Sequence, residues 1–365
     1  MTKKKLLFFL TCLLFIFPLK AISLLNMEKE AVYPNSTDSL YQKPNKGLFK
    51  TIANAFSASD TTYISPNKYV FSLMLENSNW YEYYRFSSTS ETPQTLSLQP
   101  DMKNKFGVYF GWKWIFLGYS INLDAIRGNS KPQNRRTEFG LSLYSSLVGC
   151  DIYYRKSGTD FTLLNSSDFY TPNEVSTKID QISGITVDVS GVNVYFIFNH
   201  KKFSYPAAYS QSTNQKRSVG SFIAGFSYTK HNIKFDYQEL PSIIRDQLDD
   251  GLKFKQLVYR GYNVSAGYGY NWVFAKNCLF NLTLMPAIAY KRSNTSKEST
   301  AKEIINNFNF DFTTRAGITY NNTKYYVGAS LLMHTYDYRT DKFAINNNFG
   351  TIRIYFGFNF LRKKK

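Results

Sequence analysis

Cysteine, histidine and long apolar runs are all scarce in this chain of 365 residues. The chain has three cysteines and three histidines, too few for a disulfide scaffold and, because the histidines lie far apart, without the spacing of a zinc site. The mean hydropathy is −0.33. The longest apolar run, residues 6–19, is shorter than the roughly 20 residues that a membrane-spanning helix needs. A multi-span helical membrane protein is therefore excluded.

Aromatic residues are the abundant class. Tyr and Phe number 29 and 31, and aromatics make up 18% of the chain against 19% for charged residues. Such a chain has ample apolar surface to bury, which excludes a disordered protein. Basic residues outnumber acidic ones by 44 to 26, a formal net charge of +18.

The first 23 residues have the pattern of an export signal. Three lysines follow Met1, the apolar run 6–19 comes next, and the small residues Ala21 and Ser23 provide a cleavage site. We predict a cleaved signal peptide over 1–23; the alternative, an uncleaved anchor, is disfavoured by the short apolar run. An exported chain is not expected to bind nucleic acid, so we attribute its excess positive charge to Lys-rich loops.

Apolar residues recur at every second position in one segment after another, which is typical of β-strands with one apolar face. For example, Phe308, Phe310 and Phe312 alternate with polar residues. Similar stripes occur in 106–112, 262–272, 280–290 and 352–360. A soluble β-sandwich also alternates, but its strands are usually about five or six residues long. Several of these segments reach the roughly 9–11 residues that a transmembrane strand needs.

These patterns predict an all-β fold, an antiparallel up-and-down transmembrane β-barrel of about 12 strands, with 14 as the alternative. Thirteen segments read as strands, and bacterial barrels of one chain have an even number. We therefore take 68–76, at the N-terminal edge of the barrel region, to continue the lead-in, and read 79–88 as the first strand. The predicted parts are a periplasmic lead-in or plug over 24–67, the barrel over 68–361 and a basic tail over 362–365. Short turns and long loops alternate, with 89–103, 158–189 and 340–348 among the long ones.

The connection 200–217 breaks this alternation, because it falls on the short-turn side and yet has about eighteen residues. It carries four cations and no acid: Lys201, Lys202, Lys216 and Arg217. Short turns of such barrels face the periplasm. We expect this basic periplasmic loop either to fold under the barrel as a plug or to receive a periplasmic partner.

Several segments carry a family resemblance: Asn199–Ser227 around that loop, Gly111-Trp-Lys-Trp-Ile115, Ser142-Leu-Tyr-Ser145, Gly149–Arg155 and Gly267-Tyr-Gly-Tyr-Asn271. They resemble the domain-of-unknown-function family forty-four twenty-one, predicted secreted β-barrel proteins of Gram-negative bacteria. The resemblance covers roughly 60–361. It implies an exported barrel and no particular activity, so no catalytic residue is carried over.

Charged residues also occur on the polar side of the stripes, where they would point into the lumen. They are Glu138, Asp151, Arg155, Asp311, Arg315, His334 and Arg353. Buried charges have to be paired, so one interpretation is a structural ion-pair network that fills a narrow barrel. The other is a pore lining.

An outer-membrane lipid hydrolase is the enzyme alternative, with His334 as base near Ser330 and Asp337. Residues four apart on a strand are about 13 Å apart, so a triad would need a serine from another strand, and no Gly-x-Ser-x-Gly motif occurs. We expect no enzyme activity, no metal and no cofactor. Cys150 and Cys278 fall on the lipid-facing side and are expected to stay unpaired.

The sequence thus predicts a protein of the outer membrane of a Gram-negative bacterium. A passive pore or uptake protein for small polar solutes is the first hypothesis. A non-conducting envelope-structure or interaction barrel with an ion-paired lumen is the second, and a lipid hydrolase the third. The expected partners are outer-membrane lipid, the barrel-assembly machinery and a periplasmic protein at 200–217.

Overall fold

The computed structural model describes residues 59–100, 103–112, 115–122, 137–159, 161–165, 168–169, 181–293 and 307–363. The chain divides into two compact units, 1–57 and 58–365. All described residues belong to the second unit, and the architecture below is that of this unit. The predicted signal peptide and most of the predicted lead-in lie outside the described residues.

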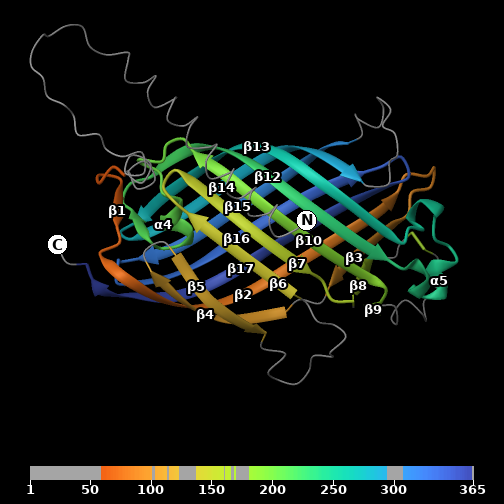
Figure 1. Ribbon diagram of the computed structural model, residues 1–365, viewed down its shortest axis with the longest axis horizontal. Coiled ribbons are helices and arrows are strands. Elements are labelled where there is room, and N and C mark those ends of the chain that lie inside the picture. The colour runs from red at the N-terminus through yellow and green to blue at the C-terminus, as the bar shows by residue number, and fades with distance from the viewer. Residues whose placement is uncertain are drawn as a thin grey trace, which may run out of the picture. The chain divides into compact units, whose positions relative to one another are not determined.

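Twelve of the described strands form the wall of an antiparallel β-barrel, and consecutive wall strands pair with one another at every junction but one (Figure 1). They are β2 (Tyr69–Ser88), β4 (Lys103–Trp112), β5 (Ile115–Asn122), β6 (Thr137–Tyr144), β7 (Val148–Lys156), β10 (Ile185–Ile197), β12 (Val219–Phe235), β13 (Gln256–Ala275), β14 (Cys278–Ser293), β15 (Phe308–Asn321), β16 (Tyr325–Arg339) and β17 (Phe343–Arg362). The last strand, β17, pairs with the first, β2. Within the described residues β5 pairs with β4 and β6 with β7. No pairing of β5 with β6 occurs among the described residues, and an ion pair between Lys105 on β4 and Glu138 on β6 spans this junction.

The period-two pattern gives the wall an apolar outer face and a polar inner face. On β13 and β14 the outward Val264 and Ile288 are 66% and 63% exposed, while the inward Asn263 and Thr283 are at most 2% exposed. This is the reverse of a soluble protein, and it is the arrangement of a transmembrane barrel, whose outer face contacts lipid. The twelve-stranded barrel fold predicted from the sequence is confirmed.

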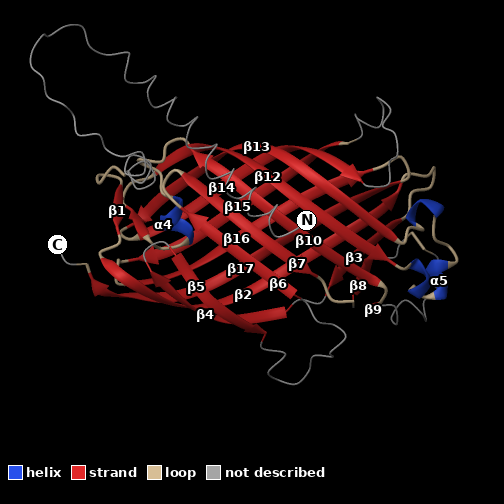
Figure 2. Ribbon diagram, viewed as in Figure 1, coloured by secondary structure: helices blue, strands red, loops and turns tan. Residues whose placement is uncertain are grey.

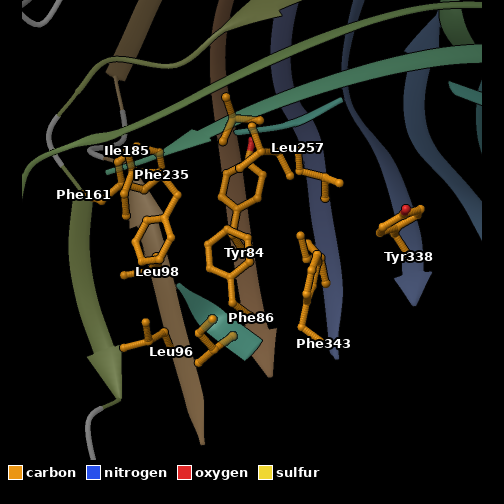
Figure 3. Packing of buried hydrophobic residues seen from close by; sticks show 14 of the residues in the cluster. Tyr84, Phe86, Leu96, Leu98, Phe161, Ile185, Phe235, Leu257, Tyr338 and Phe343 are labelled. Atoms are coloured by element: carbon orange, nitrogen blue, oxygen red, sulfur yellow. The ribbon is translucent and has the colours of Figure 1, made fainter. Parts of the chain in front are cut away.

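The long-loop end is filled by an apolar cap. Three short strands, β3 (Thr95–Pro100), β8 (Phe161–Asn165) and β9 (Gln181–Ile182), extend the sheet from the outer half of β2. The helix α5 (Ser242–Arg245) lies in the loop after β12, flanked by the 3-10 turns η3 (Tyr237–Glu239) and η4 (Asp250–Leu252). Apolar side chains from these segments and from the barrel wall pack into one cluster, in which Phe86, Leu98 and Phe235 are fully buried (Figure 3).

The opposite end holds a second insertion, made by the long connection between β10 and β12. It consists of α4 (Tyr205–Tyr209) and β11 (Thr213–Gln215), and β11 pairs with the N-terminal strand β1 (Ile64–Pro66). Pro206 at the start of α4 and the Ser204 hydroxyl, which accepts a hydrogen bond from the Ala207 N–H, begin this short helix. The helices of the described residues therefore lie at the two ends of the barrel (Figure 2).

The assignment of 68–76 to a lead-in is wrong. Residues 69–88 form the single twenty-residue strand β2, which the Asn77-Ser78-Asn79 stretch does not interrupt. Asn77 pairs with Ile354 of β17 on one side and Phe106 of β4 on the other. A ladder on both sides outweighs the turn preference of Asn and Ser.

Three predicted loops are also shorter or more structured than expected. Segments 89–103 and 158–189 contain β3, β8 and β9, whose inward residues join the apolar cap. The predicted long loop 340–348 reduces to 340–342, because β17 begins at Phe343.

The outward apolar band generates a first prediction. The side chain of Ile354 is 59% exposed and lies between the outward residues Ile352 and Phe356 on β17. Ile354→Arg should lower the free energy of unfolding by about 2–4 kcal/mol in lipid, because it places a cation within the hydrocarbon. The measurement is urea unfolding of the reconstituted barrel.

Two matched variants control for this result. Ala344→Arg, on the same strand and face but at the long-loop end, should cost only about 0–1 kcal/mol, and Ile354→Leu should be close to neutral. Equal costs for the two arginines would show that the band does not face lipid.

Candidate functional site

The interior of the barrel is the candidate site, because all seven charged residues predicted for the lumen lie on the inward face. Asp151, Arg155, Asp311, Arg315 and His334 are buried, at most 4% exposed. The carboxylate side chain of Glu138 is 5% exposed and the guanidinium side chain of Arg353 is 29% exposed. The structure gives six of them an ionic partner and places His334 in aromatic packing.

An ion pair between Arg315 and Asp151 crosses the lumen. Arg315 is on β15 and Asp151 on β7, five strand positions apart around the wall. The Ser142 hydroxyl donates to the other carboxylate oxygen of Asp151 over 2.6 Å. The guanidinium carbon of Arg315 lies 5.1 Å from the centre of the Tyr195 ring, which adds a cation–π contact.

A second crossing joins β7 to β2. The Arg155 Nη2 atom is 2.8 Å from the Glu82 Oε1 atom, and both side chains are at most 3% exposed. The guanidinium carbon also lies 4.1 Å from the Trp80 ring centre. One layer away, the hydroxyls of Tyr153 on β7 and Tyr336 on β16 are 2.8 Å apart. These last two strands are six positions apart in a wall of twelve, so the tyrosines meet from opposite sides.

A third pair is buried against the wall. The Lys291 Nζ atom is 2.5 Å from Asp311 Oδ1 and also donates to the backbone carbonyl of Asp337. The Asn263 side chain donates to Asp311 Oδ2 over 2.7 Å. A fourth pair joins neighbouring strands: the Arg353 Nη1 atom on β17 is 3.8 Å from the Glu76 Oε2 atom on β2.

Four ionic partners escaped the sequence interpretation: Glu76, Glu82, Lys105 and Lys291. Their signal was present, because each has the parity of the inward residues on its own strand. Glu76 was hidden by the false assignment of 68–76 to a lead-in.

Residues 203–215 of the connection 200–217 occupy the short-turn end of the lumen. The Tyr209 hydroxyl donates to Asn281 Oδ1 over 2.5 Å, and the Gln211 amide donates to the Tyr355 hydroxyl over 3.0 Å. The Asn321 amide in turn donates to Gln211 Oε1 over 3.0 Å. All five residues of α4 are buried. This segment, the lumen plug (residues 203–215), therefore contacts β14, β15 and β17 at once.

The four cations of that connection stay outside the lumen. Lys201, Lys202, Lys216 and Arg217 are all exposed. Lys202 and Arg217 lie 5.2 and 5.8 Å from the ring centre of Tyr63, just before β1. Burial lowers the pKa of the neighbouring His200 imidazole, so its charge adds little to this basic surface at neutral pH.

The residues considered for hydrolysis do not assemble. His334 stacks beside Tyr336, and its Nδ1 atom is 3.1 Å from the Thr313 hydroxyl. Asp337 has the opposite parity to His334, and its carboxylate accepts a hydrogen bond from Asn346. The Ser330 hydroxyl accepts one from Arg353 Nε over 3.2 Å. Cys150 and Cys278 are free thiols. Within the described ranges no group of three or more His, Cys, Asp or Glu could hold a metal ion.

A polar hollow lies on the outside of the wall rather than in the lumen. It has a volume of about 530 Å³ and spans the outer ends of β2, β16 and β17. Its lining includes Tyr83, Arg85, Asp337, Arg339 and Asn348. The side chains of these residues face away from the ion pairs described above, because they sit on the outward parity of their strands.

A family model described as "Domain of unknown function (DUF4421)" matches residues 58–360. The chain belongs to this family. The match confirms the resemblance seen in the sequence and covers almost the whole described unit, and the family description assigns no activity. No curated protein matches the chain.

Solved structures give only remote likenesses. The outer membrane protease OmpT from Escherichia coli is 8% identical, with 82% of this chain and 100% of that chain covered and a TM-score of 0.35. The toluene transporter TodX from P. putida is 7% identical, with coverages of 80% and 91% and a TM-score of 0.23. The CymD monoaromatic hydrocarbon channel is 10% identical, with coverages of 89% and 95% and a TM-score of 0.25. Scores of this size carry no inference about activity.

No helix in the described part of the family member is long and apolar enough to cross a membrane.

The crossing ion pair generates the second prediction. Arg315→Ala should lower the free energy of unfolding by about 3–5 kcal/mol, because it leaves the Asp151 carboxylate buried without its cation. The double variant Arg315→Met with Asp151→Leu should recover most of this loss, since an apolar pair of similar volume replaces a buried ion pair at little cost.

Urea unfolding of the barrel in detergent micelles measures the free energy of unfolding of both the single and the double variant. A double variant as unstable as Arg315→Ala would show that the two side chains are not paired across the lumen.

Proposed function

We propose that this protein is a non-conducting outer-membrane barrel that serves as an envelope-structure or interaction protein through its two ends. The observation that carries the proposal is the pair of contacts that cross the lumen, Arg315 with Asp151 and Tyr153 with Tyr336. Contacts between opposite walls obstruct the lumen at that level, which supports a closed barrel.

The proposed outer-membrane location is supported by two features of the chain. The first is the export signal that the sequence predicts over 1–23. The second is the outward apolar face of the wall, which would be unstable in water. Closed barrels avoid unpaired backbone groups in hydrocarbon.

Opening the lumen would be costly. Separating Arg315 from Asp151, or Arg155 from Glu82, would leave charges that are at most 6% exposed without partners. Each broken buried pair costs about 3–5 kcal/mol. The apolar cap and the lumen plug add two further layers above and below the ion pairs.

With its interior filled, the barrel offers its ends for contact. The short-turn end presents the exposed cations Lys201, Lys202, Lys216 and Arg217 around Tyr63. We propose that an acidic periplasmic partner docks there. The long-loop end presents the cap built on α5 and β3.

A passive pore for small polar solutes is the second candidate. One observation favours it: the wall behind the lumen plug is polar. Asn271, Asn281, Thr319 and Asn321 are buried there, and amide or hydroxyl groups of the plug bond to them. Such a wall would accept water if the plug withdrew.

Planar-bilayer conductance separates the two candidates and gives the third prediction. The proposed closed barrel should be silent, and deletion of residues 203–215 should leave it nearly silent, because the crossing pairs remain. If the protein is instead a passive pore, deletion of the plug should produce steady ion flow. Heat-modifiable gel mobility confirms that the deleted form is folded. Steady conductance from the intact chain would refute the proposal.

A further inference from the structure

Three cations form a row on the outer face of the wall, near the long-loop end. Lys230 on β12 pairs in register with Arg260 on β13, and Arg260 pairs with Arg292 on β14. All three have the outward parity of their strands, and Lys230 and Arg292 are exposed. Neighbouring strands are about 4.8 Å apart, so the cationic row (Lys230, Arg260 and Arg292) spans about 10 Å.

A row of tyrosines lies next to the cationic row, two residues nearer the middle of each strand. Tyr228 pairs with Tyr262, and Tyr262 with Tyr290. The rings of Tyr228 and Tyr262 are 5.3 Å apart, and Phe308 continues the row 5.5 Å from Tyr290. The next row of outward-facing residues, two positions closer to the middle of the strands, is apolar and contains Val264 and Ile288. Aromatic girdles of transmembrane barrels mark the boundary between hydrocarbon and headgroups. The cationic row is thus at headgroup level.

The row concentrates positive charge on three adjacent strands. Like charges directly opposite each other on adjacent strands are destabilising. β12, β13 and β14 contain no Asp or Glu. The Arg260 guanidinium lies beside the Tyr228 hydroxyl, which places it at the girdle. The nearest acid on the adjacent strand β10 is Asp188, which pairs in register with Asn232 and accepts a hydrogen bond from it.

We propose that the cationic row is a docking site for the phosphorylated headgroup of an outer-leaflet glycolipid. Two arginines and a lysine present a line of donors to phosphate oxygens, and Arg in particular binds phosphate with two parallel hydrogen bonds. The tyrosine row beneath them packs against the start of the acyl chains. A phosphate group cancels the repulsion within the row, so the bound lipid stabilises the pairing of β12, β13 and β14.

The test is lipid binding by the full chain in nonionic detergent micelles. The probe is a bisphosphorylated glucosamine-disaccharide lipid, compared with its dephosphorylated form and with inorganic phosphate at equal phosphate concentration. Affinity is taken from the rise of the unfolding midpoint with probe concentration. We expect the phosphorylated lipid to bind at least about tenfold more tightly than the dephosphorylated one.

The variant Lys230→Gln/Arg260→Gln/Arg292→Gln should lose about 100-fold in affinity for the phosphorylated lipid, at about fivefold per cation. The control Lys253→Gln/Lys255→Gln/Lys342→Gln removes the same charge from exposed positions at the same end of the barrel, and should lose less than about threefold. If the triple row variant fails to fold, Lys230→Gln alone should lose about fivefold.

Three results would overturn the proposal. Unchanged affinity in the row variants would show that these cations do not bind the lipid. An equal loss of affinity in the control variant would show that the effect comes from net charge alone. An equal midpoint shift with inorganic phosphate would assign the row to free phosphate instead of a membrane lipid.

Discussion

The constraint on which the structure depends is that charge inside a narrow barrel has to be paired. The wall strands direct apolar side chains to lipid and polar ones inward, so inward Arg, Lys, Asp and Glu side chains lose most of their contact with water on folding. Arg315 and Asp151 satisfy this requirement by meeting across the lumen. A wider barrel could hydrate such groups; here the pairs brace opposite walls and fix the spacing between them.

Both ends of the barrel are filled, one by apolar side chains and the other by hydrogen-bonded polar side chains. At the long-loop end, β3, β8 and α5 bring apolar side chains onto Phe86 and Phe235, so water is excluded by packing. At the short-turn end, Tyr209 and Gln211 of the plug satisfy the buried amides of Asn281 and Asn321. The outer face adds a third environment, where the Tyr228, Tyr262 and Tyr290 row separates an apolar band from the cations Lys230, Arg260 and Arg292.

The sequence was sufficient for the barrel but only partly for its interior. Alternation with period two assigns a side to each residue, so the inward position of Arg315 or Asp311 could be predicted from parity alone. The partner of each charge could not, because Arg315 and Asp151 are 164 positions apart in the chain and parity does not specify which strands face each other. Polar turn formers misled the assignment at Asn77, where pairing on both sides keeps β2 extended. The apolar cap could not be predicted either, because Leu96 and Leu98 lie in a strand too short to be distinguished from a loop by its sequence.

Thiol labelling inside the lumen tests the closed-barrel account most directly. Thr283 on β14 is fully buried on the inward face beside the plug, and Lys276 lies in the exposed turn before the same strand. Each is replaced singly by cysteine in a Cys150→Ser/Cys278→Ser background and treated with a small, charged thiol reagent. The account predicts that Thr283→Cys reacts only in urea, while Lys276→Cys reacts at once in the folded barrel. Comparable rates at both positions in the folded barrel would show an open, hydrated lumen and contradict it.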